Sequence, residues 1–448
     1  MCAVAPAAAN ASQSQQLVFD ARRDVLDPAR RAEALDQVKR LGADQLRLLV
    51  YWKDVAPQAD SRTAPSGDLR DPAAYSWGAY DDVMAAARER GLPVLLTLSL
   101  PGPKWAMRDR KDYLTYPSAA QFGRFVEAAG RRYGAQVSTW AIGNEPNHPD
   151  FLRPQYRKGR AVSPSLYRQL FRAADSALRR SGNGDDTVLI GETLPRGKRG
   201  TSVAPLAFLR GMLCLNRSYR ETKPCGKLDA DGFAHHPYTT QAGPFFRSPN
   251  RDDVTIGTLS RLTSALDRAA RTGNIAAHLP IWLTEFGVQS TPDRFAGVSL
   301  TRQVEDRAIG ERIAYSTSRV KAFSQYLLTD DPPIEGVTAS QRYGNFESGL
   351  RFATGRDKPS LKGFRLPIAA LRSGGRVSVW GLARPATGPT RVEILAQDRG
   401  SKSFRPLKTV ATNRYGGFVT ATAYRSGRRF RLRWNGELGA PTRIRADK

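Results

Sequence analysis

The 448-residue chain has few of the side chains that most often bind metals, with three cysteines and four histidines. They do not fall at zinc-ligand spacings, and no GxGxxG pattern follows the first apolar segment, which argues against a zinc finger and a dinucleotide-binding fold. No run of about 18 apolar residues occurs, so no membrane-spanning helix is expected. We therefore predict no metal, no cofactor and no membrane span.

Acidic residues are scarce beside basic ones, with 42 Asp and Glu against 69 Lys and Arg and a net charge of +27. Such an excess can attract nucleic acid, an acidic glycan or a cell surface. Here the basic residues are mostly arginine and are spread along the whole chain, which is typical of a GC-rich genome. The signatures of nucleic-acid readers are also lacking. We interpret the charge as compositional and expect no specific nucleic-acid partner.

Two of the three cysteines, Cys214 and Cys225, lie close together in a loop-like stretch. A disulfide that closes this loop is expected, which implies an oxidising compartment, and a pair of free thiols is the alternative. Residues 1–15 are rich in Ala, Ser and Gln and are typical of a signal-peptide remnant or of a disordered tail. Together these features predict a secreted protein.

Apolar strand-like segments alternate with amphipathic helical segments from residue 16 to about residue 365. Strands are expected at 16–20, 46–51, 93–99, 138–143, 187–191, 232–235, 281–284 and 322–328, and helices at 28–41, 80–90, 118–133, 165–180, 258–272 and 301–320. This alternation predicts an α/β protein, and its count favours a closed (β/α)8 TIM barrel over an open doubly wound sheet.

The pattern changes near residue 365. Residues 366–448 hold short alternating segments separated by Gly, Pro and Asn, which predicts a small antiparallel β-sandwich as an accessory domain. Trp380 and Trp434 lie in this part and are interpreted as core residues, with a place in a glycan site as the alternative. The expected molecule is a monomer with a barrel over 16–365 and a sandwich over 366–448.

Two predicted strands lead directly into glutamates. The fourth continues into GNEPN, which contains Glu145, and the seventh into TEFG, which contains Glu285. In a TIM barrel the active site lies at the carboxyl ends of the strands, and strands four and seven face each other across it. Retaining glycosidases need two carboxyl groups about 5–5.5 Å apart. The pair predicts glycoside hydrolysis, whereas either residue alone is equally typical of a surface ion pair.

The motifs WAIGNEPN on strand four, HHPY after strand six and WLTEFG on strand seven resemble clan A of the retaining glycoside hydrolases. That clan includes family 5 cellulases and mannanases and family 39 β-xylosidases, and the resemblance covers about residues 16–365. It implies that Glu145 is the general acid/base, that Glu285 is the nucleophile, and that Asn144 hydrogen-bonds the sugar 2-OH. The implied partner is an oligo- or polysaccharide with a β-linked sugar.

The resemblance also implies a supporting set. Arg47 on strand two would lie near the nucleophile and favour its ionised form, with an ordinary strand-end ion pair as the alternative. In HHPY, His236 would lie near the acid/base, and the Tyr238 hydroxyl would hydrogen-bond the nucleophile. His235 should point to the opposite face and be structural. No Asp/Glu/His cluster completes a metal site around the two histidines.

Aromatic side chains near strand ends are candidates to stack on the apolar faces of sugar rings. They are Trp52 after strand two, Trp105 after strand three and Tyr326 on strand eight. Members of the clan often carry a tryptophan at the end of strand eight, where this chain reads AFSQYLLTDD, so the preferred sugar stays open. Trp140 and Trp282 lie one position off the inward register and should pack against the outer helices.

Double displacement needs an acid that carries a proton and a nucleophile that does not. We expect Glu145 to be protonated in the free protein and Glu285 to be ionised beside Arg47. A glycan-binding protein that has lost catalysis is the alternative from another class, and a transglycosylase would use the same residues.

Overall fold

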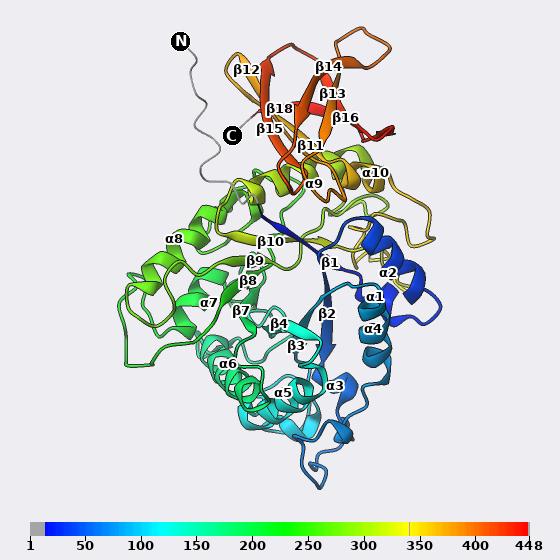
Figure 1. Cartoon of the computed structure of the whole chain (residues 1–448). Coiled ribbons are helices and arrows are strands. Elements are labelled where there is room, and N and C mark those ends of the chain that lie inside the picture. The colour runs from blue at the N-terminus through cyan, green and yellow to red at the C-terminus, as the bar shows by residue number, and fades with distance from the viewer. Residues whose placement is uncertain (1–13, 340, 447–448) are drawn as a thin grey trace.

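The computed structural model of the chain describes residues 14–339 and 341–446. Within them, eight parallel strands close into a barrel in the order β1-β10-β9-β8-β7-β4-β3-β2 (Figure 1). Their bounds are Gln16–Asp20 (β1), Gln45–Tyr51 (β2), Val94–Ser99 (β3), Val137–Ile142 (β4), Thr187–Thr193 (β7), Gly232–His235 (β8), Ile281–Leu283 (β9) and Val320–Tyr326 (β10). The predicted TIM barrel is confirmed. Residues 1–13 of the predicted tail lie outside the described residues.

Helices cover the outside of the barrel. They are α1 (Arg22–Leu26), α2 (Arg31–Arg40), α3 (Trp52–Val55), α4 (Gly78–Glu89), α5 (Ala119–Tyr133), α6 (Ser163–Arg180), α7 (Pro205–Met212), α8 (Leu259–Ala270), α9 (Leu300–Tyr315) and α10 (Pro359–Arg365). The loops add three 3₁₀ turns, at Pro72–Ala74, Lys104–Ala106 and Ile256–Thr258, and a hairpin of β5 (Tyr156–Arg157) and β6 (Arg160–Ala161). In the described part of the chain, no helix has both the length and the apolar character that crossing a bilayer requires.

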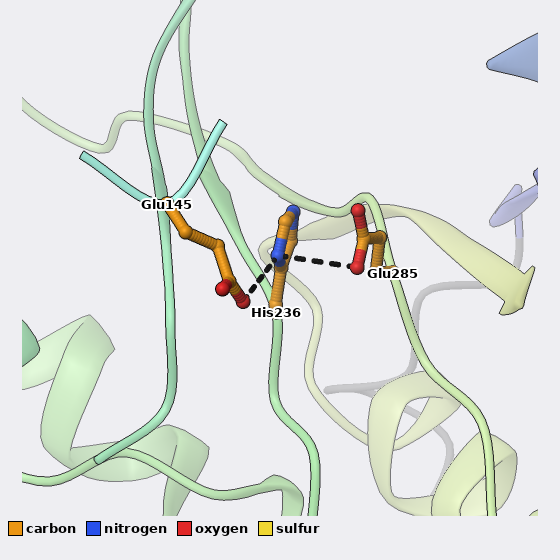
Figure 2. A group of neighbouring side chains, drawn as sticks. All are labelled: Glu145, His236 and Glu285. Atoms are coloured by element: carbon orange, nitrogen blue, oxygen red, sulfur yellow. Dashed lines mark hydrogen bonds and ion pairs between the residues drawn. The ribbon is translucent and has the colours of Figure 1, made fainter. Parts of the chain in front are cut away.

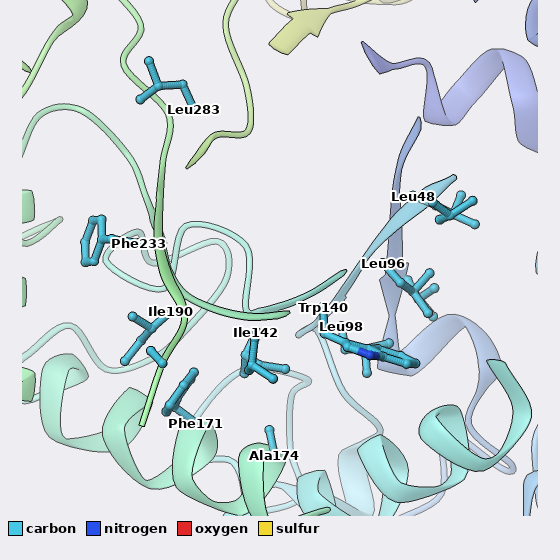
Figure 3. Packing of buried hydrophobic residues seen from close by; sticks show 14 of the residues in the cluster. Leu48, Leu96, Leu98, Trp140, Ile142, Phe171, Ala174, Ile190, Phe233 and Leu283 are labelled. Atoms are coloured by element: carbon cyan, nitrogen blue, oxygen red, sulfur yellow. The ribbon is translucent and has the colours of Figure 1, made fainter. Parts of the chain in front are cut away.

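The barrel strands read as continuous apolar runs because both of their faces are covered. Every residue of β3 is buried, for example. The outward faces pack against the helices, as Figure 3 shows for Ile142, which lies near Phe171 and Ala174 of α6. Trp140 belongs to the same layer, which confirms the prediction that it packs outward.

The barrel interior holds a separate cluster with one residue from each of seven strands: Val18, Leu95, Ala141, Leu189, Ala234, Trp282 and Ala322. The prediction that Trp282 packs against the outer helices is therefore wrong. That prediction placed Trp282 one position off the inward register, but β9 ends at Leu283, so the regular alternation does not continue to Glu285. A Cβ at Gly232 on the neighbouring strand would lie 2.2 Å from the Trp282 ring, so the glycine makes room for it.

The C-terminal part forms an eight-stranded sheet within residues 368–446. Its strands are β11 (Ile368–Ser373), β12 (Arg376–Leu382), β13 (Arg391–Gln397), β14 (Arg405–Ala411), β15 (Gly417–Ala423), β16 (Arg429–Trp434), β17 (Glu437–Leu438) and β18 (Thr442–Ala446). The order is β14-β13-β16-β18-β11-β12-β15, and the pairs are antiparallel except β11 with β18. The sheet curls around its own apolar core, as predicted for a β-sandwich. Trp434 is partly buried against this core, in keeping with its interpretation as a core residue.

Helix α9 joins the two parts, and Figure 1 shows the C-terminal sheet lying against α9 and α10. Trp380 is fully buried and packs with Ile309 and Tyr315 of α9, so its interpretation as a core residue is confirmed. Glu305 of α9 is buried too, and accepts hydrogen bonds of 2.8 Å from both Nε and Nη2 of Arg443. The polar side of α9 is thus covered by the second sheet, which stabilises the contact between the two parts.

Cys214 and Cys225 form the predicted disulfide, with their Cα atoms 6.1 Å apart. The bridge closes the loop that follows α7. Arg168 of α6 donates hydrogen bonds to the carbonyl oxygens of Met212 (2.9 Å) and Gly226 (2.8 Å). These contacts tie both ends of the bridged loop to the barrel wall.

Candidate active site

A cavity of about 870 Å³ opens where the barrel strands end at their carboxyl side. This is the volume range of small-molecule sites and the usual place of a TIM-barrel active site. Its lining includes Asp20, Arg22, Arg23, Arg47, Tyr51, Asn144, Glu145, Phe151, Glu285, Tyr326, Asp331 and Phe346. The two glutamates selected from the sequence therefore face the same cavity.

Arg47 of β2 is the centre of a buried charge network. Its Nη1 donates to Asp20 (2.6 Å) and Glu285 (2.7 Å), and its Nη2 to Asn144 Oδ1 (2.8 Å) and Glu192 Oε2 (2.6 Å). Its Nε donates to the second oxygen of Glu192 at 3.1 Å. A guanidinium fork can serve this many acceptors at once, which an ammonium group cannot do in the same geometry. Arg47 thereby links five of the barrel strands rather than forming a single ion pair.

The side chain of His236 lies between the two glutamates, as Figure 2 shows. Its Nδ1 is 3.0 Å from Glu145 Oε1 and 3.5 Å from Glu285 Oε2. One carboxylate oxygen of Glu145 and one of Glu285 lie within 4.8 Å of each other. The Tyr238 hydroxyl donates to Glu285 Oε2 at 3.0 Å, while Arg47 holds Oε1. Both oxygens of Glu285 are therefore fixed.

The backbone around Glu145 is in a conformation that side chains rarely adopt. Glu145 has a φ of 40°, and Gly143 before it has a φ of 83°. The Glu145 amide donates to the carbonyl oxygen of Glu192, which itself has a φ of 44°. Left-handed non-glycine residues gather at functional sites, where the surroundings hold them in place. This turn directs the Glu145 carboxylate into the cavity.

Burial and neighbouring charge act in opposite directions on the titratable groups. Burial raises the pKa of Glu285 to about 7, although His236 and Arg47 favour its ionised form. Burial lowers the pKa of His236, but the charges of Glu285, Glu145 and Glu192 outweigh it and raise that pKa above its ordinary value. Burial and the two neighbouring cations thus act against each other at this carboxyl, and an ionised Glu285 stays a prediction.

His235 points to the other face of β8, as predicted. One of its ring nitrogens is 2.9 Å from Thr193 Oγ1 and the other is 2.9 Å from the Val254 carbonyl oxygen. Burial lowers the pKa of His235 to about 3. A neutral imidazole with both nitrogens bonded is structural.

No family model matches the chain, and no curated protein sequence does so. The chain does match solved structures. A family 39 glycoside hydrolase from the gut symbiont Bacteroides cellulosilyticus WH2 has a TM-score of 0.57 and 15% identity, over 92% of this chain and 81% of that chain. A glucosidase from Croceicoccus marinus has a TM-score of 0.55 and 14% identity, over 95% and 96%. At these identities the likeness establishes a shared fold along nearly the whole chain.

The predicted stacking of Trp52 and Trp105 on a sugar is wrong. Trp52 is fully buried, and its ring lies 5.6 Å from those of both Trp105 and Phe125. Trp105 is 4% exposed and donates to the Pro57 carbonyl oxygen at 3.1 Å. Strand β2 ends at Tyr51, and Trp52 begins α3, which turns its side chain toward α5. Both tryptophans are core residues below the cavity lining.

Other aromatic side chains line the cavity instead. Tyr326 lies there as predicted, and it is joined by Tyr51, Phe151 and Phe346. Tyr51 stacks on Phe151 with ring centroids 6.4 Å apart. Tyr51 is the last residue of its strand, so a reading of strand ends one residue earlier would have found it.

Sequence reasoning also missed two buried acids of the network, Asp20 and Glu192. Asp20 ends β1 in QLVFD, and Glu192 lies near the end of β7 in TVLIGET. The signal was the same as for the two glutamates, a carboxylate after an apolar strand. Reading the end of each strand, and not only of the fourth and seventh, would have found both.

Glu145, His236 and Glu285 are the group among residues 14–339 and 341–446 whose ligand atoms are spaced as a metal ion would need. The prediction that no cluster completes a site around the histidines overlooked it, because the three residues follow three different strands. Two carboxylates and an imidazole suit zinc or manganese. His236 Nδ1 already lies 3.0 Å from Glu145 Oε1 and 3.5 Å from Glu285 Oε2, so the geometry fits proton sharing equally well. Function without a metal stays a prediction.

Proposed function

We propose that the chain is a retaining O-glycoside hydrolase that cleaves a β-linked glycan through a covalent glycosyl-enzyme. Glu285 is the nucleophile and Glu145 the general acid/base. The observation that carries the proposal is the spacing of less than 4.8 Å between oxygens of these two residues across one cavity. Retaining enzymes hold the carboxyl groups about 5–5.5 Å apart, and inverting enzymes about 6.5–9.5 Å apart to admit a water molecule.

In the first step the Glu285 carboxylate attacks the anomeric carbon as the bond to the leaving oxygen breaks. Glu145 gives its proton to that oxygen, so the leaving group departs as an alcohol. Arg47 and Tyr238 hold one Glu285 oxygen each and so fix the orientation of the attacking group. The product of this step is a glycosyl ester of Glu285.

In the second step water replaces the leaving group. Glu145, now ionised, takes a proton from the water as its oxygen attacks the anomeric carbon, and the ester bond to Glu285 breaks. His236 is 3.0 Å from Glu145 and 3.5 Å from Glu285, where its positive charge favours the ionised form of whichever glutamate has lost its proton. Two inversions give net retention.

Asn144 would bind the sugar beside the nucleophile. Its side-chain oxygen accepts a hydrogen bond from Arg47, so its amide NH₂ is the group that can donate to a sugar hydroxyl. We also propose that the protein is secreted, which the Cys214–Cys225 disulfide supports.

The test is azide rescue of two variants on a panel of 4-nitrophenyl β-glycosides. Glu285→Ala should lose at least about 10³-fold in kcat, and azide should restore turnover with a glycosyl azide of inverted configuration, since it attacks directly. Glu145→Ala should lose less on this good leaving group. Azide should then give an azide of retained configuration, since it attacks the glycosyl ester.

The two product configurations are each other's control, and the double variant should give neither product. A retained azide from Glu285→Ala would overturn the assignment of the nucleophile. If the wild type and both variants are equally inactive on each glycoside and on polysaccharides but bind them, the protein is a glycan-binding protein. Transfer of the sugar to an added alcohol faster than to water would identify a transglycosylase.

A further inference from the structure

The loop after β10 brings an aromatic ring to the place that the sequence left without one. Phe346 lines the cavity, and 40% of its surface is exposed. Its ring centroid is 4.9 Å from that of Tyr326, edge to face, and 6.0 Å from that of Tyr238. Tyr238 in turn donates to Glu285. Phe346 thus stands beside the carboxylate that would attack the sugar.

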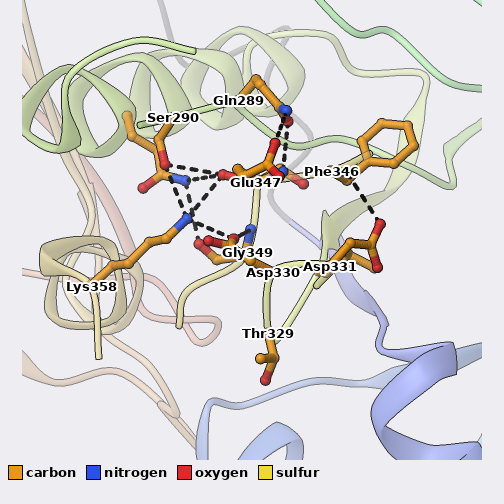
Figure 4. Close-up of polar contacts among 12 residues, drawn as sticks. Gln289, Ser290, Thr329, Asp330, Asp331, Phe346, Glu347, Gly349 and Lys358 are labelled. Carbon is orange, nitrogen blue, oxygen red and sulfur yellow. Dashed lines mark hydrogen bonds and ion pairs between the residues drawn. The ribbon is translucent and has the colours of Figure 1, made fainter. Parts of the chain in front are cut away.

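The segment 346–349 that carries this ring is fixed on both sides. Both backbone groups of Phe346 bond to Asp331, its N–H to Oδ2 at 3.2 Å and its carbonyl oxygen to the Asp331 N–H at 2.9 Å. The next residue, Glu347, donates its N–H to Gln289 Oε1 at 2.9 Å. Its carbonyl oxygen accepts from the Ser290 N–H at 3.2 Å. Figure 4 shows these contacts converging on the segment.

A buried ion pair lies beneath the segment. Lys358 Nζ is 2.6 Å from Asp330 Oδ1 and also donates to the Glu347 carbonyl oxygen (2.9 Å) and Ser290 Oγ (3.0 Å). Asp330 Oδ1 accepts from the Gly349 N–H at 2.9 Å as well. The side chains of Lys358 and Asp330 are 0% and 2% exposed. Contacts so well shielded from water hold a loop in one position. The Phe346 ring is therefore a fixed part of the cavity wall.

The loop after β9 is shaped to receive this segment. A Cβ at Gly287 would lie 2.2 Å from the Tyr326 carbonyl oxygen and 2.6 Å from Ser348 Cβ. Ser348 Oγ donates to that same carbonyl at 2.6 Å. The glycine of the TEFG motif therefore allows β9, β10 and the segment 346–349 to meet. The wall is built into the barrel mouth next to Glu285.

The charges around the wall decide what kind of sugar it suits. The cavity lining has more carboxylates than guanidinium groups, and each of its three arginines has an acceptor already. Arg47 holds its network, Arg22 donates to Asp54 (2.9 Å), and Arg23 donates to the Asp330 carbonyl oxygen (2.6 Å). A sugar carboxylate at Phe346 would face Asp331, and the cation nearest to Asp331, Arg23, already pairs with it at 3.9 Å.

We propose that Phe346 forms the aromatic wall of the subsite for the sugar that Glu285 attacks, and that Phe346 and Asp331 together select a neutral sugar over a uronic acid. The ring covers the apolar C–H face of the sugar, and the Asp331 carboxylate accepts hydrogen bonds from its hydroxyls. This rests on the proposed function, because Glu285 sets which sugar occupies the subsite.

The test measures binding in a background that does not turn over substrate. The dissociation constants of Glu285→Gln for the 4-nitrophenyl β-glycosides of glucose, galactose, mannose, xylose and glucuronic acid are determined by calorimetry. At least one neutral glycoside should bind about tenfold or more tightly than the glucuronide. Adding Phe346→Ala should raise the dissociation constant of that neutral glycoside about 2- to 13-fold, the range of a lost aromatic contact. Adding Asp331→Asn should reduce the ratio between the dissociation constant of the glucuronide and that of the neutral glycoside.

Phe295→Ala is the matched control, because Phe295 is 65% exposed and does not belong to the cavity lining. It should leave each constant unchanged. An unchanged constant in Phe346→Ala, or tighter binding of the glucuronide than of each neutral glycoside, overturns the inference. Turnover by the wild type is scored separately, so a failure of the proposed hydrolysis is told apart from a failure of the wall. In the wild type, Phe346→Ala should raise KM and leave kcat nearly unchanged, since the wall touches ground state and transition state alike.

Discussion

Replacing Arg47 with methionine should destabilise the protein strongly and in a pH-dependent way. The guanidinium offsets three carboxylates, those of Asp20, Glu192 and Glu285, whose side chains are 2%, 0% and 9% exposed. Methionine fills a similar volume but leaves these acids without a counter-charge. Their burial without a counter-charge then favours the protonated forms in the folded state.

The magnitude follows from the number of partners lost. Breaking one buried ion pair by removing a single partner costs about 3–5 kcal/mol, and Arg47 has three. Protonation limits the total, because a neutral carboxyl tolerates burial. We expect the free energy of unfolding at pH 8 to fall by about 3–5 kcal/mol or more. This is a large part of the free energy of unfolding of a typical protein, which is about 5–15 kcal/mol. The deficit is therefore small below about pH 4, where these acids are protonated in the unfolded chain as well, and larger as the pH rises.

Urea unfolding of wild type, Arg47→Met and Arg47→Lys at pH 5 and pH 8 measures this. Lysine keeps the charge and loses the fork, so its deficit should be smaller than that of methionine at both pH values. Arg425→Met, which removes an exposed pair with Asp398, should unfold at the same urea concentration as the wild type. A stability of Arg47→Met within about 1 kcal/mol of wild type at pH 8, or a deficit larger at pH 5 than at pH 8, would refute this reasoning.

Two other predictions concern pH and the disulfide. Because burial raises the pKa of Glu285 to about 7 and only its ionised form attacks, kcat/KM for a neutral glycoside should fall about tenfold per pH unit below about pH 7; a rate that is constant down to pH 5 would contradict it. The double variant Cys214→Ser, Cys225→Ser should lose about 3 kcal/mol in urea unfolding, the entropy of closing a loop across 11 residues, and an unchanged midpoint would contradict that.

The sequence by itself determined the barrel and the positions of its two glutamates at the cavity. Strands buried on both faces are local apolar runs, so the eight barrel strands could be placed without tertiary information. The carboxyl ends of parallel strands meet at one end of a barrel, so Glu145 and Glu285 had to face one cavity. The disulfide followed in the same way, since its two cysteines are close along the chain.

Only the tertiary structure decided which side chains surround those glutamates. Trp52 and Trp282 were misplaced because a single residue decides where a strand stops and a helix or loop begins, and this changes the direction of each side chain. The joint engagement of Asp20 and Glu192 by Arg47 depends on barrel closure, which brings together strands far apart in the sequence. Phe346 comes from a long loop whose return to the barrel mouth depends on buried contacts among Lys358, Asp330 and Glu347, and no local pattern records such contacts.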